Sequence, residues 1–141
     1  MNEILSGIAT YYEARIYIGS RQRYNGPEFS EDDLVAVIGD FQTRLYKLLG
    51  DKSISAPVRI TKTRYVFGDY SEVGWEIGIL NYPRKPNLPD ELREFALELA
   101  KHLLVKFNQN RISVVCKGNN FLSPDFEIVM FYADDAEQSH K

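Results

Sequence analysis

Apolar residues alternate with polar ones along five stretches of the chain, a period that is typical of β-strands with one covered face. These stretches span residues 15–20, 57–67, 73–81, 111–117 and 125–132. Two other stretches carry apolar residues at helical spacing, one between Ser30 and Gly50 and one from Pro89 to Phe107. The pattern therefore predicts the element order β-α-β-β-α-β-β.

The ends of both predicted helices carry residues that suit those positions. Ser30 is a good N-cap, Asp33 stands three residues later, and Gly50 is placed to end the helix. Pro89 suits the first turn of the second helix because its missing N–H would have no partner there. These signals support the assigned boundaries.

This order predicts an α+β fold, a two-layer sandwich in which an antiparallel sheet carries two helices on one face. The first six elements match the ferredoxin-like order, and one strand is added. We expect residues 1–132 to form a single domain and the polar residues 133–141 to form a frayed tail.

Two helices cover only one face of such a sheet, so the other face is predicted to be open. The covered face takes Ile16, Ile18, Trp75, Ile77, Ile79, Ile112, Val114 and Cys116. The open face takes Arg15, Tyr17, Arg59, Thr61, Gly74, Glu76 and Gly78, and its two glycines leave room for a close approach to the backbone. The last strand is apolar on both faces. Together with the open face, this predicts a homo-oligomer, a dimer or higher.

Composition narrows the classes of partner. The chain has 141 residues and one cysteine, so no intramolecular disulfide forms. Its net charge is -3, which makes duplex nucleic acid an unfavoured partner. No apolar run reaches the length of a membrane span, and the first residues do not have the pattern of a signal peptide. We therefore expect a cytoplasmic protein with no membrane partner.

The usual catalytic motifs are missing from the sequence. Of the two histidines, His102 lies beside an apolar helical stripe and His140 lies in the tail. Cys116 alternates with apolar residues and is expected to be a buried small side chain. No zinc-ligand spacing, nucleophile elbow or phosphate-binding loop occurs. The sequence alone thus predicts a binding protein with no metal or cofactor, and not an enzyme.

The most unusual local feature is the loop after the first strand. It combines Arg21 and Arg23 with Tyr24, Asn25 and flanking glycines. Guanidinium groups bind phosphate oxygens bidentately, and a tyrosine ring can stack on a base. Five further residues could contribute to the same ligand site, although the sequence does not show whether they converge: Arg59, Tyr82, Arg84, Arg111 and Asn119.

The opening pattern RIYIGSRQRYNGPEFS, followed by a helix, resembles the Thoeris anti-defence sponges of phages. The resemblance implies a homo-oligomer in the host cytoplasm that binds a cyclic ADP-ribose isomer without cleaving it. Such a protein antagonises the host's TIR-based anti-phage defence by sequestering this nucleotide signal. Its ligand pockets would lie between subunits.

Three other functions stay open at this point. A ferredoxin-like domain can bind single-stranded nucleic acid through aromatic residues on its open sheet face, although the net charge is unfavourable. A small enzyme that cleaves cyclic nucleotides would be recognised by turnover. A scaffold or inhibitor would bind another protein through the sheet.

Overall fold

The computed structural model describes residues 3–23, 25–54, 56–118 and 126–133. Its elements follow the predicted order, with a short 3-10 turn, η1, after the first helix. Their bounds are β1 Tyr12–Gly19, α1 Glu31–Leu49, η1 Gly50–Lys52, β2 Val58–Phe67, β3 Tyr70–Leu80, α2 Pro89–Lys106, β4 Arg111–Gly118 and β5 Phe126–Tyr132. The strands β1 and β3 each begin three residues before the predicted start.

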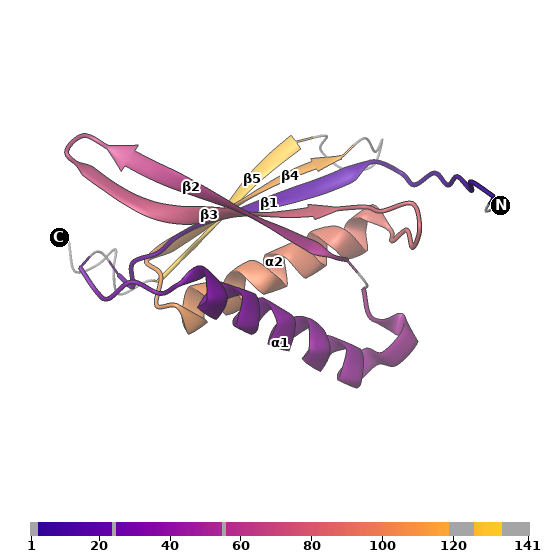
Figure 1. The fold of residues 1–141 in the computed structure, drawn as a ribbon, viewed down its shortest axis with the longest axis horizontal. Coiled ribbons are helices and arrows are strands. Elements are labelled where there is room, and N and C mark those ends of the chain that lie inside the picture. The colour runs from indigo at the N-terminus through magenta and orange to yellow at the C-terminus, as the bar shows by residue number, and fades with distance from the viewer. Residues whose placement is uncertain (1–2, 24, 55, 119–125, 134–141) are drawn as a thin grey trace.

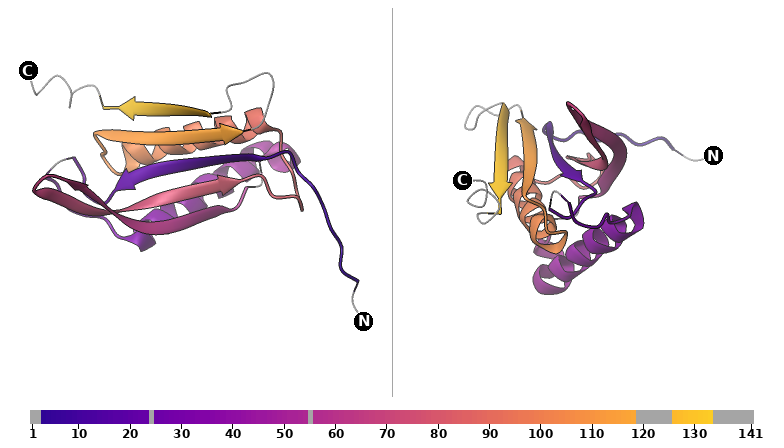
Figure 2. Two further views of the ribbon diagram at one scale, coloured as in Figure 1. Left: turned by 90° about the horizontal axis from the view of Figure 1, so that it is seen from above. Right: turned by 90° about the vertical axis from the view of Figure 1, so that its left-hand side faces the viewer.

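The five strands form one sheet in the order β2-β3-β1-β4-β5, and every neighbouring pair is antiparallel. The first four strands have the order of a ferredoxin-like fold, and β5 is added beside β4. The α+β prediction is therefore confirmed. Figure 1 shows both helices on the same side of the sheet, and the end-on view of Figure 2 shows the two layers.

The core lies between the helices and the covered face of the sheet. Burial alternates along β1 and β4 as the sequence predicts, because successive strand side chains point to opposite faces. The eight residues that were assigned to the covered face are all buried. From α2, Leu92, Ala96, Leu99 and Leu103 complete this core and are fully enclosed.

The start of α1 is fixed by a capping box. The Ser30 hydroxyl accepts a hydrogen bond from the backbone N–H of Asp33, and the Asp33 carboxylate accepts one from the Ser30 N–H. One residue into the helix, the Glu31 carboxylate accepts a hydrogen bond of 3.0 Å from the Trp75 indole. The Trp75 ring packs on Phe29 at 5.2 Å between centroids. Cap and core contacts thus fix this end of α1 against the sheet.

Cys116 and His102 both lie in the surroundings that the sequence predicted for them. Cys116 is buried, and burial raises the pKa of its thiol, in agreement with a structural role. His102 is partly buried and packs on Phe41 at 5.1 Å. Within the described residues, neither helix has the length and apolar character needed to cross a membrane. The predicted tail lies outside the described residues from position 134 onward.

Candidate functional site on the open sheet face

The face of the sheet that the helices leave uncovered carries the polar side chains of the strands. Its central rows follow from the strand register. Gly78 of β3 pairs with Arg15 of β1 on one side and with Arg59 of β2 on the other. In the next row, Glu76 of β3 pairs with Tyr17 of β1. Charged and aromatic groups from three strands are therefore adjacent on this face.

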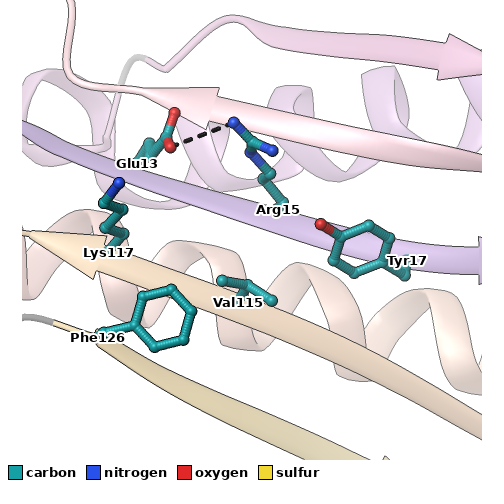
Figure 3. A pocket seen from close by; sticks show the side chains of 6 residues that line it. All are labelled: Glu13, Arg15, Tyr17, Val115, Lys117 and Phe126. Carbon is teal, nitrogen blue, oxygen red and sulfur yellow. Dashed lines mark hydrogen bonds and ion pairs between the residues drawn. The ribbon is translucent and has the colours of Figure 1, made fainter.

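A shallow pocket of about 260 Å³ lies on this face where β1, β4 and β5 run side by side. Figure 3 shows its lining, with charged side chains along β1 and an aromatic ring and an aliphatic side chain from the neighbouring strands. The lining residues are Glu13, Arg15, Tyr17, Val115, Lys117 and Phe126. The pocket thus combines both signs of charge with apolar surface, as ligand sites commonly do.

Arg15 lies between two carboxylates at the centre of this face. Its Nη2 lies 3.4 Å from Glu13 Oε1, and its Nε lies 3.5 Å from Glu76 Oε1. Glu13 raises the pKa of Arg15, and Tyr17 and Glu76 act in the same direction. We call Glu13, Arg15 and Glu76 the acidic centre, because two carboxylates there share one guanidinium. Two further cations border it, Lys117 in the pocket lining and Arg59 over Gly78.

Tyr65 of β2 extends this surface toward the edge of the sheet. Its phenol donates a hydrogen bond of 3.0 Å to the backbone carbonyl of Trp75. Burial raises the pKa of Tyr65, and the neighbouring Tyr17 and Glu76 raise it further, so this phenol stays protonated at neutral pH. Tyr65 is therefore a fixed neutral group beside the acidic centre.

The glycines of β3 make room for side chains of this same chain. A Cβ on Gly74 would overlap the Tyr65 ring and the backbone oxygen of Ile18. A Cβ on Gly78 would lie 2.5 Å from Nη2 of Arg59. The close approach that the sequence suggested does occur, and the approaching groups are Tyr65 and Arg59.

The basic loop after β1 is held by polar contacts within the molecule. Arg21 Nη2 lies 3.3 Å from Glu28 Oε1, and the Arg21 backbone N–H donates to Glu72. The Nε of Arg21 is buried and has no hydrogen-bond partner among the described residues. Arg23 has a positive φ of 54° and donates a hydrogen bond of 3.2 Å to Asn110 Oδ1.

The structure describes seven of the nine predicted site residues and divides them between the two ends of the sheet. Arg21, Arg23 and Asn25 belong to the loop after β1, which contacts the turn before Arg111 at residues 108–110. Arg59, Tyr82 and Arg84 lie at or near the other end, where β2 begins and β3 ends. An eight-residue strand is about 26 Å long, so the two groups do not form one pocket. Tyr24 and Asn119 lie outside the described residues.

The sequence-based site left out the residues that line the pocket. Arg15 and Tyr17, which line the pocket, and Glu76, which contacts Arg15, were placed on the open face but were not assigned to the site. The sequence does contain a signal for the β1 residues. Glu13, Arg15 and Tyr17 stand at alternate positions of this strand, and a solvated face would need only small polar residues there. The described residues hold no cluster of three or more potential metal ligands.

Comparison with known proteins gives a fold match. No protein-family model matches the chain, and no curated protein sequence matches it. Two solved structures match over 95% of this chain and 97% of their own. They are a phage SAM lyase in complex with S-methyl-5'-thioadenosine, at 17% identity and a TM-score of 0.61, and a phage SAM lyase in the apo state, at 18% and 0.62. These likenesses establish the fold.

The match corrects one expectation and supports part of another. Both neighbours are named as a lyase, which contradicts the expectation that the chain is not an enzyme. The expectation was wrong because it searched for nucleophiles, metal clusters and phosphate loops, which a lyase can lack when its substrate carries its own leaving group. One neighbour is in complex with a small nucleoside, a nucleotide-like ligand that lacks the phosphates of the expected cyclic ADP-ribose isomer. The resemblance to the Thoeris sponges is not confirmed.

Proposed function

We propose that this protein is a lyase that binds S-adenosylmethionine on its open sheet face and releases S-methyl-5'-thioadenosine. The proposal rests on the fold shared with the phage SAM lyase structures and on the chemistry of the open face. A phage enzyme of this kind would act in the host cytoplasm.

The atoms of the substrate account for the reaction without a group from the protein. The bond between the sulfonium sulfur and the γ carbon of the amino-acid chain breaks, and its electron pair stays on sulfur. The product S-methyl-5'-thioadenosine is therefore a neutral thioether. The four-carbon fragment either closes on itself through its carboxylate oxygen, which forms a lactone, or transfers a proton from its β carbon to its own carboxylate, which leaves an alkene. Neither route uses water or an oxidant.

The observation that carries the proposal is the acidic centre around Arg15, with aromatic residues beside it. S-adenosylmethionine carries a sulfonium and an ammonium group against one carboxylate, so its net charge is positive. Glu13 and Glu76 offer carboxylates to these two cationic groups, whereas Arg15, Arg59 and Lys117 on the same face are positive. The rings of Tyr17 and Phe126 offer faces for a sulfonium cation or for the adenine.

The catalytic contribution of this site would be orientation of the substrate. A flexible amino-acid chain must adopt one conformation for the sulfur–carbon bond to break, and fixing that conformation accounts for large accelerations of intramolecular steps. In this proposal Glu76 holds the cationic part of the substrate, because it extends from β3 toward Arg15 on the central strand β1. Tyr17, beside it in the same row, limits the space above β1.

The experiment that tests the proposal is product analysis by liquid chromatography and mass spectrometry. Purified protein is incubated with S-adenosylmethionine, and heat-denatured protein serves as the control because the substrate also decomposes slowly by itself. We expect S-methyl-5'-thioadenosine to form in proportion to native enzyme. Formation at the same rate with denatured protein would contradict the proposal.

A cyclic ADP-ribose isomer is the second candidate ligand, and the basic loop is the feature that favours it. Arg21 and Arg23 are held in place by Glu28 and Asn110, and the buried Nε of Arg21 has no partner among the described residues. A pyrophosphate could bind such preorganised guanidinium groups. Calorimetry with this nucleotide, using Arg23→Ala as the variant, tests this ligand separately from S-adenosylmethionine.

A further inference from the structure

We infer that Arg59, seated on Gly78, binds the carboxylate of the substrate and makes the site selective for nucleosides that carry an amino-acid chain. This inference rests on the proposed function, because it assigns a specificity residue within the same site. Arg59 would contact the amino-acid chain of S-adenosylmethionine, which the product S-methyl-5'-thioadenosine lacks.

Arg59 is positively charged, and its contacts within the molecule decide whether a ligand can use that charge. Arg15, the nearest guanidinium across β3, already has two carboxylate partners. Arg59 has no hydrogen-bond or ion-pair partner among the residues that the structure describes. Its positive charge is therefore available to an anionic group of a ligand, whereas that of Arg15 is not.

The guanidinium of Arg59 lies over the neighbouring strand β3. Arg59 begins on β2, but its Nη2, Cζ and Nε lie 2.5, 2.9 and 3.3 Å from the place where a Cβ of residue 78 would stand. The side chain thus crosses from β2 to lie over β3, and the glycine makes this possible. Arg15 pairs with Gly78 from the opposite side, so the Arg59 guanidinium lies beside the acidic centre.

A ligand that contacts both Phe126 and Arg59 must extend across the sheet from β5 to β3. Phe126 on β5 and Gly78 on β3 are separated by three strand spacings, about 14 Å across the strands. An adenine stacked on Phe126 would place the ribose and sulfur above β4 and β1. The amino-acid chain would then extend to β3, with its ammonium near Glu76 and its carboxylate at Arg59. The planar fork of arginine matches a carboxylate bidentately.

Lys117 is the competing cation, because it lines the pocket and lies in register with Glu13. Its ammonium is a point charge on a flexible stem, so it gives a carboxylate no bidentate partner. It also lies on the β4 side of the pocket, where the proposed ligand places its ribose. Lys117→Gln therefore tests this competing assignment, because it removes the other positive charge that could bind the carboxylate.

The test uses two thioethers that the enzyme cannot cleave through a sulfonium. S-adenosylhomocysteine carries the amino-acid chain, and S-methyl-5'-thioadenosine lacks it. Calorimetry measures both with the wild type and with Arg59→Gln, Arg59→Lys, Gly78→Ala and Lys117→Gln. In the wild type we expect tighter binding of S-adenosylhomocysteine. Arg59→Gln should weaken this ligand by about 10- to 100-fold and leave S-methyl-5'-thioadenosine unchanged.

Gly78→Ala keeps the charge and moves the guanidinium, because only the flexible end of Arg59 lies where the new methyl group would stand. It should reduce the same preference, whereas Arg59→Lys should keep part of it. A wild type that binds both ligands with a preference that survives Arg59→Gln would overturn the inference. So would loss of the preference in Lys117→Gln alone. A wild type that binds neither ligand would instead contradict the proposed function.

Discussion

Trp75 shows how one side chain joins the sheet, the first helix and the loop before it. Only 3% of its surface is exposed, its indole donates to Glu31, and its ring packs on Phe29. Trp75→Ala removes this packing and leaves a cavity, so the free energy of unfolding should decrease by about 3–5 kcal/mol. Urea denaturation followed by circular dichroism measures it. A decrease below about 1 kcal/mol would contradict its place in the core.

His102 should make stability depend on pH below neutrality. Burial lowers its pKa in the folded protein, and the positive charges of Arg44 and Lys106 act in the same direction. Above about pH 6.5 the imidazole is neutral in both states and contributes nothing. As the pH falls below this value, the unfolded chain binds a proton that the folded chain binds less readily, so stability decreases.

The measurement is the urea midpoint at about pH 7 and about pH 5, for the wild type and for His102→Gln. The variant cannot bind this proton, so we expect its midpoint to change less between the two pH values. Equal changes in both proteins would show that His102 titrates alike in the folded and unfolded states.

At the scale of the elements, Gly74 of β3 and Gly39 of α1 can be compared by the same substitution to alanine, because Gly74 is crowded and Gly39 is not. A methyl group on Gly74 would overlap a backbone oxygen of β1, so Gly74→Ala should separate β1 from β3 and destabilise the fold by more than about 1 kcal/mol. Gly39 lies within α1 with nothing within 4 Å of the added Cβ. Gly39→Ala should therefore stabilise the protein by up to about 1 kcal/mol.

Thermal unfolding of the two variants beside the wild type measures both effects. A Gly74→Ala variant as stable as the wild type would mean that β1 and β3 tolerate an extra methyl group between them. A destabilised Gly39→Ala variant would show instead that this half-buried position in α1 has no room for a methyl group.

The elements were predictable from the sequence because their signals are local. Ser30 and Gly50 mark the ends of α1 through their own backbone preferences, and the period-2 pattern of β1 and β4 follows from the covered face. The site was less predictable. That Arg59 lies over Gly78 depends on the register between β2 and β3, which no local pattern specifies. The two loop arginines that stood out in the sequence, Arg21 and Arg23, have Glu28 and Asn110 as partners within the molecule.

At the scale of the whole molecule, the open face predicts self-association. Beside the pocket, β5 exposes a row of large apolar side chains, namely Phe126, Ile128, Met130 and Tyr132, of which Ile128 is 64% exposed. Exposed apolar surface of this kind commonly meets another subunit. Light scattering at micromolar concentration should give a mass that is a multiple of 16.3 kDa. A single species of 16.3 kDa would contradict this prediction.

The central claim is that the open face of the sheet is the place where S-adenosylmethionine is cleaved. Its most direct test compares turnover in Glu76→Gln and Glu127→Gln, which each remove one carboxylate from opposite faces of the sheet. Glu127 pairs with Arg93 of α2, away from the pocket. We expect Glu76→Gln to form S-methyl-5'-thioadenosine at least about 100-fold more slowly than the wild type, and Glu127→Gln to stay within about 3-fold of it. Equal rates in the two variants, or no turnover by the wild type, would contradict the account.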